Sequence, residues 1–258
     1  MISIQNLSKV FSLSKKQIKE MGSDFKGNQV SAVDNISFDC QDGRIFGLIG
    51  PNGAGKTTTL RMIATMLQPS SGTISVNNYD VVIDPINVRK SLGFLSGNTG
   101  IYDRLTCEEM VKYYADLHGM SREKYEESKN KLFDLLDMHS FSNRRIGKLS
   151  TGMKQKVNIA RTMIHEPDVV VFDEPTSGLD VMTSQSIIKM IRDCKDMGKT
   201  VIFSSHRFGE IRSLCDDLAI IHSGRLFFNG TYENFESQMK ADTLEDEFIR
   251  LIKQGSDE

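Results

Sequence analysis

The sequence lacks any hydrophobic run long enough to cross a membrane. A helix needs about 20 consecutive apolar residues to span a bilayer, whereas the longest clean apolar runs in this chain of 258 residues are segments such as Val169–Phe172. The first residues, Met1–Leu7, alternate in polarity like a β-strand and lack the pattern of a signal peptide. We therefore expect a chain that reaches a membrane only through a partner.

Paired cysteines and a strong net charge are also missing. The four cysteines are widely spaced and form no C-x-x-C motif, which predicts reduced thiols in a cytosolic protein; they are Cys40, Cys107, Cys194 and Cys215. The formal net charge is −2, so the composition gives no electrostatic argument for a partner, and we expect no nucleic acid to bind. The length is sufficient for one sizeable domain.

A glycine-rich segment follows the apolar run Ile45–Ile49 and precedes a helix-like segment that starts near Thr58. It consists of Gly50, Pro51, Asn52, Gly53, Ala54, Gly55, Lys56, Thr57 and Thr58. This is the phosphate-binding pattern G-x-x-x-x-G-K-[ST] in its required strand–loop–helix context. Lys56 is expected to reach the β- and γ-phosphates of a nucleoside triphosphate, and the Thr57 hydroxyl to bind Mg²⁺. A plain turn would not require the lysine or the threonine.

The rest of the chain alternates between strands and helices, with a mostly helical stretch between them. We expect strands at 2–6, 30–40, 45–49, 73–76, 92–96, 168–172 and 200–204, and a hairpin from 218–222 and 225–229. Helices are expected at 110–118, 123–138, 181–197 and 208–215, followed by an acidic helical tail from Thr231. Thr106 and Glu109 form a capping-box pattern, and Met110, Tyr114 and Leu117 are expected to share a buried face. The polar residues 12–29 are interpreted as a surface loop, with contact to an anionic membrane as the alternative.

Polar side chains follow two further apolar strands at the point where each strand ends. Asp173 and Glu174 follow Asp168–Phe172, and Ser204, Ser205 and His206 end the strand at Thr200. Because ligands collect beyond the carboxyl ends of parallel strands, these clusters should face the phosphate loop. Asp173 is expected to hold Mg²⁺. Glu174 is the candidate base for an attacking water, with a helix-entry acid as the alternative; His206 would contact the γ-phosphate.

The segment Leu149–Lys156 resembles the signature motif of ATP-binding cassette (ABC) ATPases. Together with the phosphate loop, the strand before Asp173, the segment Ser177–Asp180 and His206, it places the motifs of that family in the family's order. The resemblance implies an α/β fold: a P-loop NTPase core with a mainly parallel sheet, N-terminal antiparallel β elements and a helical signature subdomain. We expect one nucleotide-binding domain, 1–258, with its core at 1–96 and 161–230, the helical subdomain at 97–160 and a tail at 231–258.

The resemblance further implies a head-to-tail dimer that binds two ATP molecules, each between the phosphate loop of one subunit and the signature of the other. Ser150 and Gly152 would then contact the γ-phosphate across the interface, and Asp180 would organise the facing site. Phe11 matches the aromatic residue that stacks on adenine in this family, with core packing as the alternative.

The sequence departs from the family pattern in two places. Thr151 and Met153 replace the usual glycine and glutamine of the signature, and Gly97 stands where the family has a glutamine that contacts Mg²⁺ or the attacking water. Asn98 or Ser96 could serve instead. The sequence therefore does not identify the residue that couples the site to a transport partner.

The resemblance is strongest to subunits of sodium- and drug-extruding exporters, which implies an ATPase on the inner face of the cell membrane, bound to a separate permease. Ile101, Tyr102 and Leu105 are the candidate contacts with that permease, and packing within the chain is the alternative. Two other functions are alternatives: an ABC ATPase without a membrane partner that acts as a mechanical or regulatory factor, and a small-molecule kinase.

Overall fold

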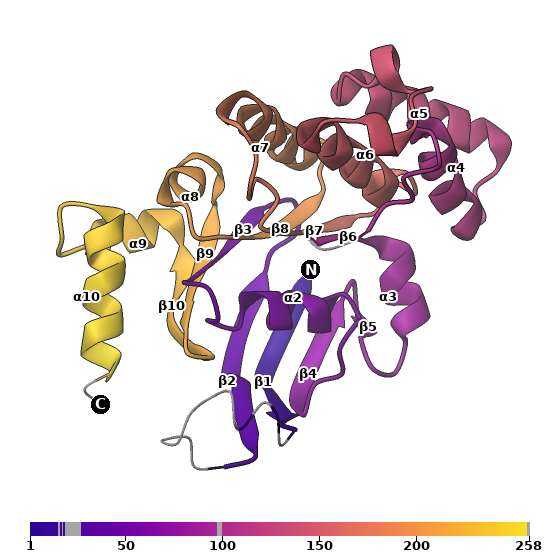
Figure 1. The fold of residues 1–258 in the computed structure, drawn as a ribbon. Coiled ribbons are helices and arrows are strands. Elements are labelled where there is room, and N and C mark those ends of the chain that lie inside the picture. The colour runs from indigo at the N-terminus through magenta and orange to yellow at the C-terminus, as the bar shows by residue number, and fades with distance from the viewer. Residues whose placement is uncertain (15, 17, 19–26, 97–99, 257–258) are drawn as a thin grey trace.

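The computed structural model describes residues 1–14, 16, 18, 27–96 and 100–256, and its strands form two sheets (Figure 1). The larger sheet has the strand order β10-β9-β3-β8-β7-β6: β3 (Ile45–Ile49), β6 (Leu92–Ser96), β7 (Val169–Asp173), β8 (Thr200–Ser205), β9 (Asp217–His222) and β10 (Arg225–Thr231). The smaller has the order β2-β1-β4-β5: β1 (Ile2–Ser12), β2 (Gln29–Cys40), β4 (Ser71–Val76) and β5 (Tyr79–Asp80).

The two sheets differ in strand direction. In the larger sheet all neighbours from β9 to β6 are parallel, and only β10 runs antiparallel to β9. The smaller sheet is antiparallel throughout. The predicted α/β fold, with a mainly parallel sheet and antiparallel N-terminal strands, is confirmed.

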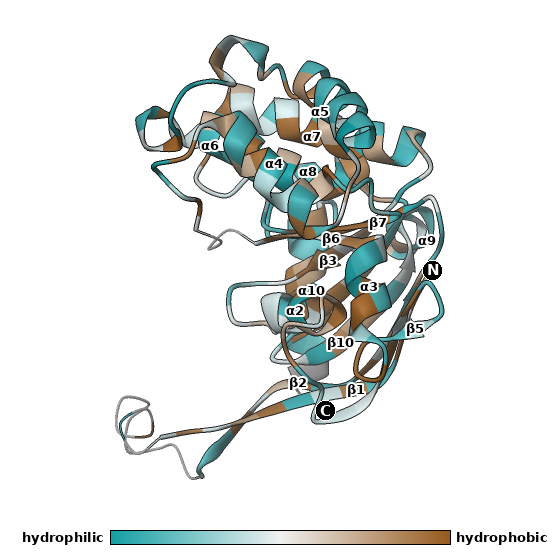
Figure 2. Ribbon diagram, turned by 90° about the vertical axis from the view of Figure 1, so that its right-hand side faces the viewer, coloured by the Kyte–Doolittle hydropathy of each residue, from teal (hydrophilic) through white to brown (hydrophobic). Residues whose placement is uncertain are grey.

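The central strands are buried on both faces because their side chains alternate between two hydrophobic clusters. On β7, Val170 and Phe172 belong to one cluster, and Val169 and Val171 to the other. This is the two-residue period of a strand covered on both sides, and Figure 2 shows such strands in brown. The second cluster fills the space between the two sheets and includes Leu60 of helix α2 (Lys56–Ile63).

Most of the remaining helices cover the first cluster. Helices α4, α5 and α6 lie together on one side of the larger sheet, and the smaller sheet lies on the other (Figure 1). The bounds are α3 (Pro85–Ser91), α4 (Cys107–Leu117), α5 (Arg122–Leu135), α6 (Thr151–Met163), α7 (Val181–Asp196), α8 (Phe208–Leu214), α9 (Tyr232–Gln238) and α10 (Leu244–Ser256). The predicted helical subdomain is thus present in α4, α5 and α6.

Helix α4 begins as predicted but buries a different set of residues. The Thr106 side chain accepts a hydrogen bond from the Glu109 N–H at 3.2 Å, and the Glu109 carboxylate accepts one from the Thr106 N–H at 2.7 Å. The prediction that Leu117 is buried is wrong, since Leu117 is 63% exposed. The buried stripe instead includes Met110, Val111 and Ala115. Leu117 lies at the edge of this stripe, at the last position of the helix, beyond the packing surface.

Helix α3 is an element that the sequence reading missed. It is only seven residues long, and Asp84 caps it by accepting a hydrogen bond from the Asn87 N–H, with Pro85 at its first position. The predicted acidic tail consists of α9 and α10. Most of the polar stretch 12–29 lies outside the described residues. Among the helices that the structure describes, none has the length and hydrophobicity of a bilayer-spanning segment.

Candidate nucleotide site

The phosphate loop connects the end of β3 to the start of α2, and two of its glycines cannot be replaced without a clash. A Cβ atom on Gly50 would lie 2.1 Å from the Ile221 carbonyl oxygen, and one on Gly55 would lie 2.5 Å from the Ala32 carbonyl oxygen. Gly55 also has a φ of +107°, which glycine adopts readily. The close approach of the Ile221 and Ala32 carbonyl oxygens therefore leaves no room for a side chain at Gly50 or Gly55.

Lys56 folds back over the loop that precedes it. Its side chain is only 4% exposed, and its ammonium group donates hydrogen bonds to the carbonyl oxygens of Gly50 at 2.6 Å and Pro51 at 3.0 Å. Burial lowers the pKa of Lys56, and the nearby carboxylate of Glu174 partly opposes that effect. The ammonium group therefore lies against the loop backbone, where a bound phosphate would meet it.

Asp173, at the end of β7, connects Thr57 of the phosphate loop to the neighbouring strand β8. Its Oδ1 accepts hydrogen bonds from the Thr57 hydroxyl at 3.0 Å and from the Ser204 hydroxyl at 2.8 Å. Asp173 is buried and lies in register with Ser204 of β8 and Ser96 of β6. The structure thus brings Thr57 and Asp173, the two predicted Mg²⁺ ligands, into direct contact.

Glu174 lies between Lys56 and His206. Its Oε1 is 3.5 Å from Lys56 Nζ and 3.3 Å from His206 Nδ1. Its backbone has a φ of +50°, an uncommon conformation for a residue other than glycine, and its N–H donates to the Ser204 hydroxyl at 2.9 Å. A residue that only started a helix would not need this conformation or these contacts.

A cavity of about 330 Å³ opens beside these carboxylates. Its lining includes Thr57, Asp173 and Glu174 from the strand ends, and Thr151 and Gln155 from α6. The Gln155 side-chain amide donates to the Pro175 carbonyl oxygen at 2.8 Å, next to Glu174. No sequence motif indicated the contact of Gln155, whereas the position of Ser204 at a strand end placed it near the phosphate loop without indicating its hydrogen bonds.

The contacts of Ser150, Gly152 and Asp180 lie at the first turns of α6 and α7. Ser150 caps α6 by accepting a hydrogen bond from the Met153 N–H at 3.3 Å. Gly152 packs against α7, because a Cβ there would lie 2.8 Å from the Thr183 hydroxyl oxygen. The Asp180 carboxylate accepts hydrogen bonds from the N–H and hydroxyl of Thr183, which lower its pKa. Ser150 and Asp180 are exposed.

The remaining predicted residues are Phe11, Ser96, Gly97 and Asn98. Phe11, near the end of β1, is 37% exposed with Lys9 Nζ 5.2 Å from its ring centre, so packing in the core does not describe it. Ser96 is buried and lines the cavity. Gly97 and Asn98 lie outside the described residues.

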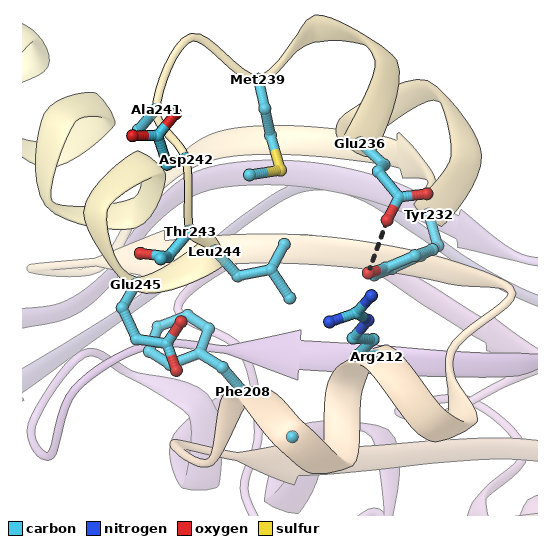
Figure 3. Close-up of a pocket in the computed structure, with 11 residues that line it drawn as sticks. Phe208, Arg212, Tyr232, Glu236, Met239, Ala241, Asp242, Thr243, Leu244 and Glu245 are labelled. Carbon is cyan, nitrogen blue, oxygen red and sulfur yellow. Dashed lines mark hydrogen bonds between the residues drawn. The ribbon is translucent and has the colours of Figure 1, made fainter.

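A larger cavity, about 510 Å³, lies near the C-terminus between α8, α9 and α10 (Figure 3). Phe208, Arg212, Met239 and Leu244 point into it, and the Tyr232 hydroxyl donates to Glu236 Oε1 at 3.4 Å. No residue of the phosphate loop or of the clusters at 173–174 and 204–206 lines it. The chemistry therefore belongs to the smaller cavity.

Comparisons with known proteins agree with this geometry. The sequence pattern of the family described as "ABC transporter" matches residues 33–177. The chain is similar to "ABC transporter ATP-binding protein NatA" of Bacillus subtilis (strain 168), with 38% identity over 99% of both chains. It is also similar to "Linearmycin resistance ATP-binding protein LnrL" of the same organism, with 31% identity over 88% of this chain and 71% of the relative. A solved structure entitled "Structure of ATP binding subunit of ABC transporter" superposes with a TM-score of 0.82 at 26% identity, covering 98% of this chain and 99% of the other.

Proposed function

The chain belongs to the ABC transporter family as an ATP-binding subunit with that family's ATPase domain, and we propose that it drives export through a separate membrane subunit. The observation that carries the proposed ATP hydrolysis is the position of Glu174, whose Oε1 lies within 3.5 Å of both Lys56 Nζ and His206 Nδ1; the export direction rests on the relatives named above. These distances support a site in which Glu174 acts as the base, Lys56 as the phosphate-binding cation and His206 as the γ-phosphate sensor.

The phosphates of ATP would lie on the N–H groups of residues 50–58, with Lys56 at the β- and γ-phosphates. The oxygens of Thr57 and Asp173 suit Mg²⁺, which prefers hard oxygen ligands and commonly takes one or two protein groups plus phosphates. These two residues would hold the ion, which when bound neutralises charge on the phosphate oxygens. Phe11 would stack on the adenine ring.

Glu174 would accept a proton from the water that attacks the γ-phosphate, and His206 would hold that water or the phosphate in place. Binding of the negatively charged phosphate gives Lys56 a stronger partner than Glu174, which leaves the carboxylate available to the water. Among the described residues, the left-handed backbone of Glu174 and its N–H bond to Ser204 fix the direction of this side chain.

The site would be completed by a second copy of the chain. Ser150 is exposed and caps α6, so its hydroxyl and the N-terminus of that helix can face a phosphate held by a partner. Gly152, in the first turn of α6, would present its backbone N–H to the partner's phosphate, and exposed Asp180 would contact the facing site. This arrangement predicts a homodimer that hydrolyses ATP and a monomer that mainly binds it.

The membrane partner would contact the surface around Tyr102, placing the chain on the cytoplasmic face of the membrane. Tyr102 is 59% exposed and its ring packs edge-on against Tyr113. Ile101 and Leu105 are half-buried and pack on the main hydrophobic cluster, so packing within the chain accounts for these two. Exposed aromatic side chains are typical of interface centres.

The proposed cargo is sodium ions or drugs. The resemblance to sodium- and drug-extruding exporters suggests both, and the name of the LnrL relative links that protein to linearmycin resistance. The alternative, an ABC ATPase that acts without a membrane subunit, would leave the Tyr102 surface without a function.

Affinity purification of the tagged chain from detergent-solubilised membranes tests the proposal. We expect a multispanning membrane protein to co-purify with the unaltered chain and with Met197→Ala, a control at another exposed apolar residue. Tyr102→Ala should lower its recovery without changing ATP binding. A chain found only with ribosomes or in the unbound fraction would favour the alternative. Phosphate release from ATP without an acceptor would exclude a kinase.

A further inference from the structure

Helix α8 begins two residues after His206 and carries a buried carboxylate, Glu210, to which the reaction described above gives no role. Glu210 is 6% exposed and does not line the cavity beside Asp173. A carboxylate that has lost its contact with water must be held by other polar groups of the chain. For Glu210 these groups come from both of the segments that supply the proposed base and its histidine partner.

One oxygen of Glu210 holds the loop that follows Glu174. The hydroxyl of Thr176, a residue that is 3% exposed, donates to Glu210 Oε1 at 2.5 Å. In the same loop the Ser177 N–H donates to the Glu174 carbonyl oxygen at 3.1 Å, so the chain makes a tight turn from Glu174 through Thr176. A displacement of Thr176 would therefore be passed to Glu174 over a very short path.

The other oxygen of Glu210 holds the segment that carries His206. The Ser205 hydroxyl donates to Glu210 Oε2 at 2.7 Å and accepts a hydrogen bond from the Arg207 N–H at 3.0 Å. A serine hydroxyl has one proton, and here that proton points at the carboxylate. The Arg207 guanidinium also lies 3.5 Å from Glu210 Oε1. The residues on both sides of His206 are thus connected to Glu210.

Glu210 forms the second of two bridges between the end of β7 and the end of β8. The first bridge is the Ser204 hydroxyl, which donates to Asp173 and accepts from the Glu174 N–H. One bridge alone would leave the two segments free to rotate about it, whereas two bridges fix both their separation and their relative direction. Between the bridges, Glu174 Oε1 lies 3.3 Å from His206 Nδ1.

We propose that Glu210 is a positioning residue for ATP hydrolysis, which holds Glu174 and His206 in one arrangement through Thr176 and Ser205. The inference rests on the roles proposed for Glu174 and His206. A displacement of about 1 Å at a reacting group can lower a rate about 100-fold, so loss of this bridge should slow hydrolysis. The phosphate loop lies outside the bridge and should still bind ATP.

Steady-state hydrolysis by the full chain at saturating chain concentration tests the proposal. Glu210→Ala should lower kcat roughly 10- to 100-fold and leave the affinity for a non-hydrolysable ATP analogue unchanged. Glu210→Gln keeps the length of the side chain and one oxygen acceptor, so it should retain most of the activity. A normal kcat in folded Glu210→Ala, or an equal loss of analogue affinity, would overturn the proposal.

Asp217→Ala is the matched control. Asp217 is 8% exposed, and its carboxylate accepts a hydrogen bond from Arg44 at 2.8 Å. It is the first residue of β9, which runs parallel to β3, so it lies at the end of the sheet opposite the phosphate loop. This variant also loses a buried, hydrogen-bonded carboxylate, and it should lose stability while kcat stays unchanged. A kcat as low as that of Glu210→Ala would show that general loosening of the fold is the cause.

The two hydroxyl partners test whether Glu210 acts through them. Thr176→Val and Ser205→Ala should each lower kcat, by less than Glu210→Ala does, because each leaves the carboxylate with one partner. Combined with Glu210→Ala, neither should lower kcat further, since the contact is already lost. Additive losses would contradict the bridge. Thermal unfolding checks that Glu210→Ala is folded; if it is not, the two single variants decide, and normal kcat in both would overturn the proposal.

The ring signals of His206 in an NMR spectrum report its position directly. Assigned from the spectrum of His206→Gln, they should shift in Glu210→Ala. The signals of His139, which lies beside Asp134 in the helical subdomain, should stay in place. A lower kcat with unshifted His206 signals would make Glu210 a general stabilising residue and contradict the positioning role.

The outcomes separate this inference from the proposed function. If Glu174→Gln and His206→Ala hydrolyse ATP at the normal rate, the roles proposed for these two residues are wrong. If both variants are impaired but Glu210→Ala is folded and hydrolyses ATP normally, those roles stand and the bridge through Glu210 is wrong.

Discussion

The Lys56 ammonium group lies 3.5 Å from the Glu174 carboxylate, between a phosphate-binding loop and the end of a parallel strand. This ion pair links the residue expected to bind the γ-phosphate to the residue expected to activate water. Because Lys56 also bonds two loop carbonyl oxygens, its charge is held in place before any phosphate arrives. The pair would bring ATP binding and ATP hydrolysis together in one small region.

Replacing Lys56 with alanine should remove ATP binding or reduce it by at least 10-fold, because the buried ammonium is the cation placed at the loop. Equilibrium titration with ATP checks the affinity. Lys131→Ala removes an equal charge from an exposed pair with Glu127 and should leave the affinity unchanged. Tight ATP binding by Lys56→Ala would contradict the assignment of the loop.

A comparison of Ser150 with Ser121 distinguishes a role in helix capping from a role in ATP hydrolysis. Ser150 and Ser121 each cap a helix by accepting a backbone N–H at 3.3 Å. Alanine at either position should lower the free energy of unfolding by about 1 kcal/mol. Only Ser150→Ala should also slow ATP hydrolysis, by about 100-fold, since it removes the hydroxyl that we propose donates to the γ-phosphate. Equal activities of the two variants would reduce Ser150 to a structural cap.

The contacts of Glu247 in the C-terminal helix α10 should make the stability of the chain fall at low pH. Hydrogen bonds from Arg250, aided by the backbone N–H groups of Lys240 and Ala241, lower the pKa of Glu247 from 4.5 to about 2. A folded-state pKa below the unfolded value stabilises the fold above about pH 4.5, and that stability is lost as the pH falls toward 2. The full effect corresponds to roughly 3 kcal/mol.

Thermal unfolding between pH 7 and pH 2 checks this dependence. Glu247→Gln should be less stable than the unaltered chain at pH 7 and should lose less stability on acidification. Glu245→Gln removes an exposed carboxylate from the same helix and should follow the unaltered chain. If both variants show the same pH profile, the contacts of Glu247 are not the cause.

The sequence was sufficient to predict the elements whose pattern is local. The run Ile45–Ile49 is a strand with those bounds, and the capping box at Thr106 starts α4, because apolar periodicity and caps depend on near neighbours. Helix α3 was missed because seven residues give too short a period, although Asp84 and Pro85 carried a start signal. Leu117 was wrongly placed in the core because packing, not spacing, decides where a buried stripe ends.

In the candidate site too, the motifs were predictable from the sequence and the tertiary contacts were not. The motifs indicate that Thr57, Asp173 and Glu174 belong together, but not that the Ser204 hydroxyl bonds Asp173 while its oxygen accepts the Glu174 N–H. The hydrogen bonds that Thr176 and Ser205 donate to Glu210 were equally invisible in the sequence, because they depend on how two strand ends meet in the tertiary structure.

Two copies of the chain should enclose ATP, and Glu174 should then promote its hydrolysis. Sedimentation of Glu174→Gln with saturating ATP and Mg²⁺ tests this most directly, since loss of the base should stop turnover but keep the ATP-bound pair together. We predict a stable dimer with ATP, a monomer with ADP, and no dimer when Lys56→Ala is added. A Glu174→Gln variant that stays monomeric with ATP and hydrolyses it at the normal rate would contradict the account.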